Sequence, residues 1–500
     1  MYDVNKLRQY FPTTTVYKDP AVMAVFKAAK IEAFLRDWII KRKADSNGRI
    51  LDIDVLSKYV ASIIPHRNEK ERLEDEARSN GETRPFLAKI SVMFHPNANN
   101  HSFEISDLGF SHAKTVIEDY VWERIKGEII GEAGGWGLIK LGYLPPEGNK
   151  KNGCFTLLDY KNFCPYEVSL DAYREARSHF ENTEEWMDIM LGAIDYNSDG
   201  FIRPSLLANE VWTAKHTMLT RLLPFIQPRI NLIELAPQQT GKSYIFGKIG
   251  KYGWLAGGGS LSRAKLFLDM RPGTKSAGLV TFNDFVAIDE IKSIKFTNDK
   301  EMAGILKTYM EDGRVKVGDV NVEGEAGIIF LGNINIEDMD GTKSMFRELP
   351  DVFHDTALIQ RIHGFIPGKN IPPLSPKMYI NGWALNTEYF TEIMHLFRVP
   401  SETMRYRGLV EELVTTGEKS DETSGREQDA VMRLCTAYMK LFFPHANSEL
   451  IRKPEFKREF SQYCLQPAKR MQETVLKQMQ ILNPAEFGNR SMSSYKLRDE

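Results

Sequence analysis

Residues 229–243 read R-I-N-L-I-E-L-A-P-Q-Q-T-G-K-S, and this stretch decides the fold of the chain. Its first half is an apolar run of the kind found in a strand that is covered on both faces. Its second half ends in Gly241-Lys242-Ser243 and leads into a predicted helix that opens at Tyr244. A turn between a buried strand and a helix presents backbone N–H groups to an anion. The stretch therefore predicts a phosphate-binding loop in an α/β nucleotide fold.

We expect this loop to hold the phosphates of a nucleotide, with Mg²⁺. Lys242 would reach the outer phosphates, and the Ser243 hydroxyl would bind the metal ion. The pattern G-x-x-x-x-G-K-[ST] asks for glycine at position 236, where this chain has Ala236, so the motif alone is weak evidence. The residues predicted to contact the nucleotide are contiguous: Ala236, Pro237, Gln238, Gln239, Thr240, Gly241, Lys242, Ser243 and Tyr244.

A second buried strand ends in two acids. Residues 285–290 read F-V-A-I-D-E, which places Asp289 to hold the metal ion and Glu290 to act as general base toward water. A strand that simply ends in two solvated acids is the alternative. The phosphate loop one βα unit earlier favours the catalytic interpretation.

Three further polar residues follow at places where an ATPase needs them. Asn333 ends the strand-like run 327–332 and would orient the attacking water, although asparagine is equally common as the first residue of a turn. Arg361, after the next helical segment, would reach a neighbouring subunit's site and stabilise transition-state charge. Arg433, in a helical pattern, would contact the same phosphates. Surface arginines are frequent, so both are modest predictions from position alone.

The bulk composition fits a cytoplasmic enzyme. The chain has 500 residues, so two or three domains are expected, and 42% apolar with 26% charged residues is ordinary for a globular protein. The net charge of −2 means that any contact with DNA must come from local patches. No apolar stretch is long enough for a membrane span. The four cysteines fit no zinc spacing: Cys154, Cys164, Cys435 and Cys464.

The periodicity divides the chain into a helical start, a β-rich middle, an α/β domain and a helical end. In the β-rich part, strands are predicted at 87–92, 136–143 and 155–158, with a helix at 113–127. Asn182 and Glu185 predict a capped helix start. The predicted domains are 1–84 (helical), 85–225 (a β-rich, OB-like collar with linking helices), 226–400 (α/β), 401–484 (a helical lid) and 485–500 (a tail).

Asp195 opens a stretch that resembles the beginning of a calcium-binding loop, D-Y-N-S-D-G-F-I. The acid required at the twelfth position falls at Leu206, and Pro204 lies where the exiting helix should form. We therefore predict a polar turn at this place.

The motifs together resemble the ATPase domain of the BrxL family, the Lon-related AAA+ proteins of BREX bacterial anti-phage systems. The resemblance rests on L-I-E-L-A-P-Q-Q-T-G-K-S (232–243), F-V-A-I-D-E (285–290), I-F-L-G-N-I-N (329–335) and H-D-T-A-L-I-Q-R-I-H-G-F-I-P-G (354–368). It covers most of the chain. The residues around Arg361 are its most particular part.

The resemblance implies the roles of Walker A, Walker B, sensor 1, arginine finger and sensor 2 for Lys242, Ser243, Asp289, Glu290, Asn333, Arg361 and Arg433. It implies an α/β AAA+ core similar to that of MCM helicases, with ATP and Mg²⁺ as cofactors. It further implies a homo-oligomeric ring of six subunits, or a stacked dodecamer, that encircles double-stranded DNA in phage defence. Other phage-defence proteins are the expected partners.

The resemblance has two departures. Ala236 replaces the first glycine of the Walker A pattern. The Lon-like protease domain would begin near residue 485, with only sixteen residues remaining, so we expect no protease activity. The leading hypothesis is an ATP-hydrolysing ring on DNA. The alternatives are an ATP-controlled DNA-binding scaffold with little turnover, and a AAA+ unfoldase that works with a separate protease.

Between the second and third motif strands, residues 313–320 alternate like one arm of a hairpin. In MCM-like proteins a hairpin at this place points at DNA, so Arg314 and Lys316 are the candidate DNA-binding residues. An exposed hairpin with ordinary surface charge is the alternative. The segment 263–275, with Arg271, is a second candidate pore element.

Overall fold

A computed structural model describes residues 2–95, 99–128, 135–146, 152–203, 206–257, 260–270, 276–296, 298–339, 343–417 and 425–498. The chain forms two compact units. One comprises Met1–Lys41, Val168–Ser262 and Asn283–Glu500, and the other comprises Arg42–Glu167 and Arg263–Phe282. These units do not follow the predicted boundaries at 84 and 225, because the first forty-one residues belong with residues 168–262 and 283–500.

The larger unit is built on a five-stranded parallel sheet. Its strand order is β17 (Gly364–Pro367), β7 (Leu232–Ala236), β16 (Gly327–Asn333), β12 (Phe285–Ile288) and β8 (Gly253–Ala256). All five residues of β7 and all four of β12 are buried, as their apolar runs predict. Because the strands are parallel, the residues that follow β7, β12 and β16 meet at one edge of the sheet.

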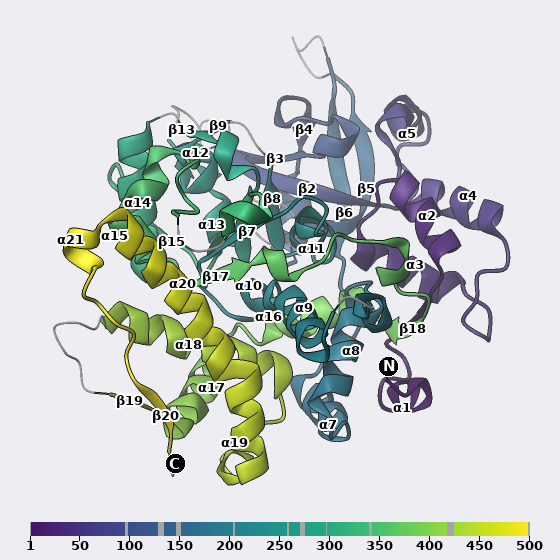
Figure 1. Ribbon diagram of the computed structural model, residues 1–500. Coiled ribbons are helices and arrows are strands. Elements are labelled where there is room, and N and C mark those ends of the chain that lie inside the picture. Colours follow the sequence, from purple (N-terminus) through teal and green to yellow (C-terminus); the bar gives the residue numbers. More distant parts are fainter. Residues whose placement is uncertain are drawn as a thin grey trace. The chain divides into compact units, whose positions relative to one another are not determined.

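Helices surround this sheet and are visible in Figure 1. Those that precede or follow the phosphate loop most closely are α8 (Thr183–Ala193), α9 (Ala208–Thr220), α10 (Leu223–Ile226) and α11 (Lys242–Lys248). Those that connect the later strands are α14 (Asp299–Asp312), α15 (Thr356–Ile359) and α16 (Thr387–Leu396). The predicted start of α8 is confirmed, since Asn182 caps it, but Glu185 accepts from the backbone of Asp3 instead of completing a capping box.

The C-terminal part of the unit is helical, with α17 (Pro400–Leu413), α18 (Gly425–Phe442), α19 (Pro454–Phe460) and α20 (Gln466–Leu482). α20 lies beside the edge strand β17 (Figure 1). The predicted tail contains α21 (Pro484–Phe487) and β20 (Tyr495–Leu497), which pairs with β19 (Val414–Thr416). Its apolar residues are therefore buried: Tyr495 and Leu497 are each under one tenth exposed.

The N-terminal segment is joined to the phosphate-loop helix by buried charges. Lys18, at the end of β1 (Thr15–Lys18), lies 2.7 Å from Asp195, and Arg36 of α3 (Ala33–Lys43) donates to the same carboxylate at 2.8 Å. Although burial favours the neutral acid, Arg36 and Lys18 hold the pKa of Asp195 well below its usual range. Tyr244 of α11 donates to Asp195 as well. The predicted polar turn at Asp195 is thus also an anchor for the first forty residues.

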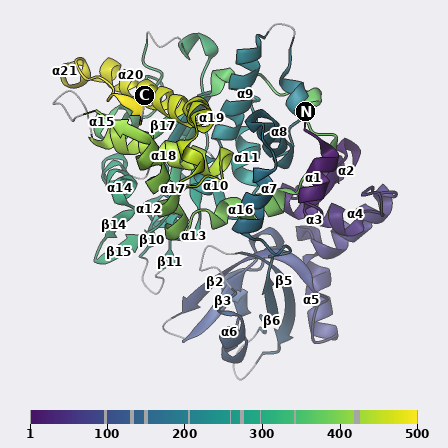
Figure 2. The same ribbon diagram turned by 90° about the horizontal axis from the view of Figure 1, so that it is seen from below.

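The smaller unit contains a second five-stranded sheet, visible in Figure 2. Its strand order is β3 (Asn100–Glu104), β2 (Phe86–His95), β5 (Gly135–Leu144), β6 (Cys154–Asn162) and β4 (Thr115–Val116). The pair β4–β6 is parallel and the other three pairs are antiparallel. A bridge between His101 and Ile117 joins the two edge strands, so the sheet closes on itself. The described helices of this unit include α4 (Ile53–Ile63), α5 (Lys70–Ser79) and α6 (Asp119–Ile125), and its second segment adds the short α12 (Arg263–Leu266) and α13 (Leu279–Phe282).

The three strands predicted in this region are confirmed by β2, β5 and β6. The predicted helix at 113–127 is wrong in its first half, which forms a 3-10 turn and β4; only α6 is helical. The reason lies in tertiary contacts, since the Thr115 hydroxyl accepts from the backbone N–H of Phe103 at 3.1 Å and β4 pairs with β6. The predicted helical start contains α2 (Pro20–Ala28) and α3, which are separated at Lys30, a residue with a positive φ of 57°. Among the described helices, none is long and apolar enough to cross a membrane.

A buried acid pair on α16 makes stability depend on pH. Lys251 lies 2.8 Å from Glu388 and 2.6 Å from Glu392. Burial raises the pKa of Glu388 to about 7. The positive charge of Lys251 opposes this shift, and the negative charge of Glu392 adds to it. A raised folded-state pKa gives stability that is present below the unfolded value of 4.5 and is lost as pH rises through about 7. Glu388→Gln should remove up to about 3 kcal/mol of this pH dependence.

The measurement is the free energy of unfolding in urea between pH 4 and 8, for the wild-type chain and the variant. Glu455→Gln is the matched control, because the Glu455 side chain is 74% exposed. A Glu388→Gln protein whose free energy of unfolding changes with pH as steeply as that of the wild type would contradict this account.

Candidate nucleotide site

The phosphate loop joins β7 to α11 through two residues in the left-handed region. Gln239 has a φ of 62° and Gly241 a φ of 81°. A side chain at Gly241 would also meet the Tyr196 hydroxyl, since a Cβ there would lie 2.4 Å from it. Glycine is therefore required at this position both by backbone angle and by space.

A buried ion pair fixes the loop from behind. Arg221, just after α9, donates to both carboxylate oxygens of Glu234 in β7, at 2.6 and 3.0 Å. The same guanidinium donates to the backbone carbonyl of Thr240 at 2.6 Å and to its hydroxyl at 3.2 Å. The Arg221 and Glu234 side chains are both fully buried. Four hydrogen bonds from one planar group thus tie strand, loop and preceding helix together.

Ala236 fits this loop because of a glycine on the neighbouring strand. A Cβ on Gly368, just after β17, would lie only 2.1 Å from the Ala236 Cβ. The two backbone segments can come this close only if one of the two positions has no side chain. The departure of Ala236 from the Walker A pattern is therefore matched by Gly368.

The residues predicted to bind the metal ion and the predicted phosphate-binding lysine lie together at the carboxyl ends of three adjacent strands. The Ser243 hydroxyl donates to Asp289 Oδ2 at 2.7 Å, and Lys242 Nζ donates to Asn333 Oδ1 at 2.8 Å. Hydroxyl and carboxylate oxygens are ligands that Mg²⁺ accepts, and it commonly takes one or two from protein and the rest from phosphate and water. In the described part of the chain, no cluster of three or more His, Cys, Asp or Glu side chains is arranged for a metal ion. Ser243 and Asp289 fit such a partly protein-bound Mg²⁺.

The electrostatics of Lys242 follow from its position. Its side chain is mostly buried, and burial together with the charge of Arg221 lowers the pKa of the ammonium, while Glu234 and Asp289 oppose this shift. An ammonium that is poorly hydrated gains more from a phosphate partner than one in water.

Glu290 directly follows Asp289 and is exposed. Its backbone is in the left-handed region, with a φ of 55°, which is uncommon for a residue with a side chain. Its backbone N–H donates to Asp289 Oδ1 at 2.9 Å, which holds the two acids in a fixed relation. A free carboxylate beside a metal ligand is what a general base needs.

Arg361 lies at the other end of the sheet. It precedes β17, its carbonyl accepts from the Asn231 side chain at 3.3 Å, and Asn231 precedes β7. The guanidinium lies 2.7 Å from Glu311 of α14. The phosphate loop follows β7, and a five-residue strand spans roughly 16 Å. Arg361 therefore does not meet the phosphate loop of its own chain.

Arg433 of α18 is at this same end. It donates to Asp429 at 3.2 Å, and burial with the nearby charge of Arg433 lowers the pKa of His363 to about 3. The His363 ring accepts from the backbone N–H of Asn231 at 2.8 Å. Arg433 Nε is buried, and no residue that the structure describes accepts a hydrogen bond from it. The structure thus brings the two predicted arginines to one end of the sheet and the loop residues to the other.

The remaining predicted residues have mixed placements. Tyr244, predicted to contact nucleotide, donates its hydroxyl to Asp195 in the buried charge cluster. The predicted hairpin forms, as β14 (Arg314–Val317) and β15 (Val320–Glu323), but Arg314 is paired with Glu323 at 2.9 Å. In the described part of the chain, no carboxylate forms an ion pair with Lys316, which is exposed. Arg271 and its neighbours up to 275 lie outside the described residues.

Sequence reasoning did not find the roles of Arg221, Glu234 and Gly368. The sequence around Glu234 indicates a buried ion pair, because a charged residue inside an otherwise apolar strand needs a buried partner. Its partner could not be named from the sequence, and Gly368 looked like an ordinary turn residue.

A parallel sheet with this strand order, a phosphate loop after its second strand and acids after its fourth define a P-loop ATPase domain of the AAA+ class. Residues 155–493 match the family model described as "Lon-like protease BrxL-like, ATPase domain". Residues 9–143 match "BREX system Lon protease-like protein BrxL N-terminal". The chain therefore belongs to the BrxL family.

Two curated relatives carry the name "Lon-like protease BrxL". The one from Escherichia coli O9:H4 (strain HS) is 26% identical over 97% of this chain and 66% of its own length. The one from Bacillus cereus (strain H3081.97) is 27% identical over 95% of this chain and 67% of its own length. The chain thus spans about two thirds of the length of these relatives.

The contact between Gly368 and Ala236 predicts a rescue by a second substitution. Gly368→Ala should push the phosphate loop away and destabilise the fold by about 1–3 kcal/mol, the usual cost of overpacking. Adding Ala236→Gly should recover part of this loss, because it removes one of the two clashing methyl groups. Urea unfolding and nucleotide binding measure the two effects.

Gly304→Ala is the matched control, since a Cβ there meets no atom within 4 Å. A Gly368→Ala chain that is as stable as the control would show that the close approach to Ala236 is not a constraint.

Proposed function

We propose that the chain binds and hydrolyses ATP with Mg²⁺. The observation that carries this proposal is the convergence of four motif residues. Ser243 lies 2.7 Å from Asp289, and Lys242 lies 2.8 Å from Asn333, although these residues come from three different strands and loops. Such a set matches what phosphoryl transfer to water requires and has no evident structural need.

Each residue has one task in this reaction. The loop N–H groups and Lys242 bind the phosphates, and Ser243 and Asp289 hold Mg²⁺, which neutralises phosphate charge when bound. Glu290 takes the proton of the attacking water. Asn333 orients that water and, through its bond to Lys242, senses whether the lysine is engaged with phosphate.

We further propose that the active site is completed by a neighbouring subunit in a homo-oligomeric ring. Arg361 and Arg433 lie at the end of the sheet away from their own phosphate loop. A head-to-tail arrangement of identical subunits brings one end of a subunit against the opposite end of the next, and it closes into a ring. Arg361 and Arg433 would then stabilise charge on a neighbour's nucleotide. A ring of six, alone or stacked as a dodecamer, follows from the resemblance to the family.

The ring would act on double-stranded DNA in phage defence. On the β14–β15 hairpin, Lys316 is the stronger candidate for phosphate contact, because Arg314 is already paired with Glu323. The closed five-stranded sheet of the smaller unit, with its one parallel pair, supports the proposal that this unit is OB-like, an architecture that binds nucleic acid in many proteins. The description of the N-terminal family model, which names the BREX system, supports the defence role.

Glu290→Gln tests the catalytic assignment. The variant should lower the ATP turnover number at least 100-fold, because it removes the general base, while ATP and duplex DNA still bind. Phosphate release under saturating ATP measures turnover, and filter binding measures DNA.

Glu455→Gln, on an exposed side chain, serves as the control for charge loss. A Glu290→Gln chain that hydrolyses ATP at the wild-type rate would refute the assignment. A wild-type chain that assembles on DNA without measurable turnover would favour the scaffold alternative instead.

A further inference from the structure

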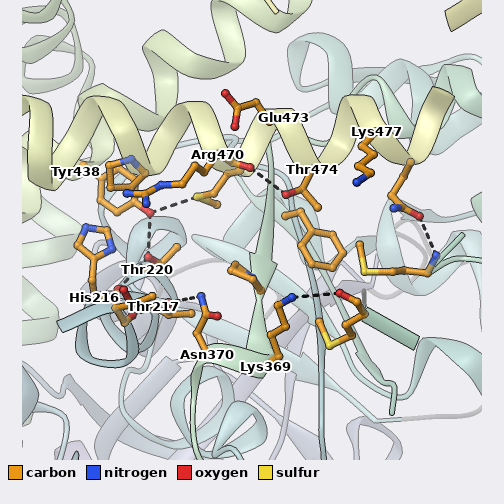
Figure 3. A pocket seen from close by; sticks show the side chains of 18 of the residues that line it. His216, Thr217, Thr220, Lys369, Asn370, Tyr438, Arg470, Glu473, Thr474 and Lys477 are labelled. Carbon is orange, nitrogen blue, oxygen red and sulfur yellow. Dashed lines mark hydrogen bonds between the residues drawn. The ribbon is translucent and has the colours of Figure 1, made fainter. Parts of the chain in front are cut away.

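A cavity of about 450 Å³ lies between α9, α18, α20 and the short 3-10 turn Gly368–Asn370 (Figure 3). This volume is in the range of sites that hold small ligands. None of the phosphate-loop residues 237–244 lines it, nor do Asp289, Glu290 or Asn333. The cavity is therefore a separate feature of the larger unit.

Three cations line the cavity without carboxylate partners. They are Lys369 from the 3-10 turn, and Arg470 and Lys477 from α20. Over the described ranges of the chain, no ion pair joins any of these three to an acid. Figure 3 shows the one lining acid, Glu473, on the side of α20 that faces away from Lys369. The cavity wall thus carries an excess of positive charge in a chain whose net charge is −2.

These cations keep donors for a ligand. Lys369 uses one N–H on the carbonyl of Met339, at 3.1 Å, and an ammonium has three. Arg470 donates Nε to the carbonyl of Gln466 at 3.3 Å, which leaves its terminal nitrogens. Clusters of guanidinium and ammonium groups of this kind are typical of phosphate recognition.

The cavity also holds a buried donor. Gln478 is fully buried, and its Oε1 accepts from the backbone N–H of Met345 at 2.8 Å, but among the described residues none accepts a hydrogen bond from its Nε2. A buried amide N–H left unpaired costs about 1–3 kcal/mol, so a ligand acceptor at this point would be strongly favoured.

Another part of the cavity lining is apolar and polarisable. Met339, Met345, Phe365 and Met471 line it and are all buried. Methionine sulfur and an aromatic ring accommodate flat apolar groups. Asn370 and Thr217, joined by a hydrogen bond of 3.4 Å, add polar atoms to the lining.

We propose that this cavity is a second ligand site, separate from the phosphate loop, which binds a small phosphorylated ligand with a flat apolar portion. A nucleoside diphosphate is the simplest ligand of this chemistry. Its phosphates contact Arg470, Lys477 and Lys369, and its ring packs on the methionines and Phe365. The proposal does not depend on hydrolysis at the phosphate loop.

Residues that line the cavity are adjacent in sequence to residues that contact the phosphate loop. Lys369 and Asn370 follow Gly368, which packs on Ala236, and Thr220 of the cavity precedes Arg221, which holds Thr240. The test must therefore separate a second ligand from one nucleotide that is held by the loop.

The probe is a fluorescently labelled ADP, and the protein is the full chain with Lys242→Ala, which disables the phosphate loop. We expect one labelled ADP to bind per Lys242→Ala chain in a saturable manner, and inorganic pyrophosphate to displace it. In the Lys242→Ala background, Arg470→Ala with Lys477→Ala should weaken binding at least ten-fold. The wild-type chain should bind two per chain.

Lys469→Ala is the matched control, because Lys469 is on the same helix but does not line the cavity; it should change the affinity less than two-fold. Arg470 and Lys477 are exposed, and a thermal melt of each variant confirms that it folds; Lys369→Ala is the substitute if the double variant fails. Absence of saturable binding to the Lys242→Ala chain overturns the proposal. Binding that the cavity variants leave unchanged overturns it as well.

Discussion

The buried pair of Arg221 and Glu234 is the interaction on which the rest of the site depends. Both side chains are fully excluded from solvent, and four hydrogen bonds from one guanidinium reach the strand and the phosphate loop. Loss of one partner from such a pair leaves an unpaired buried charge and commonly costs about 3–5 kcal/mol. The position of Thr240, and through it that of Lys242, is therefore set before any nucleotide binds. Preorganisation of this kind lowers the cost of binding phosphate, because the loop loses little freedom.

The same sheet separates the two halves of the proposed catalytic site. Its carboxyl end carries Lys242, Asp289 and Asn333, and its amino end carries Arg361 and Arg433. On the proposed mechanism, a single chain has every group that ATP hydrolysis needs but does not bring them together. Assembly into the proposed ring would couple turnover to neighbouring subunits, since each site would be complete only where one subunit's carboxyl end met another's amino end. The ion pair of Arg361 with Glu311 gives the arginine a partner that a neighbour's phosphate would replace in the proposed ring.

The sequence could predict those parts of the site that depend on local pattern. The strand before the loop, the acids after 288 and the polar end of β16 all follow from apolar runs and from the convergence of parallel strands at one edge. Features that depend on packing between distant segments could not be predicted. Arg221 meets Glu234 only when the end of α9 is brought to β7, and Gly368 meets Ala236 only when β17 pairs with β7. Likewise the strand β4 replaced a predicted helix because β6, some forty residues later, supplies its hydrogen bonds.

The most direct test of a site shared between subunits is to mix Lys242→Ala chains with Arg361→Ala chains and measure ATP turnover. Each variant alone should be inactive, because every site in its ring lacks one group. In a mixture with equal amounts of both that has exchanged subunits, about one quarter of the interfaces pair an intact Lys242 with an intact Arg361, and turnover should return to about that fraction of the wild-type rate. A mixture that forms rings and stays inactive would contradict the account, since it would show that Arg361 does not act on a neighbour's nucleotide.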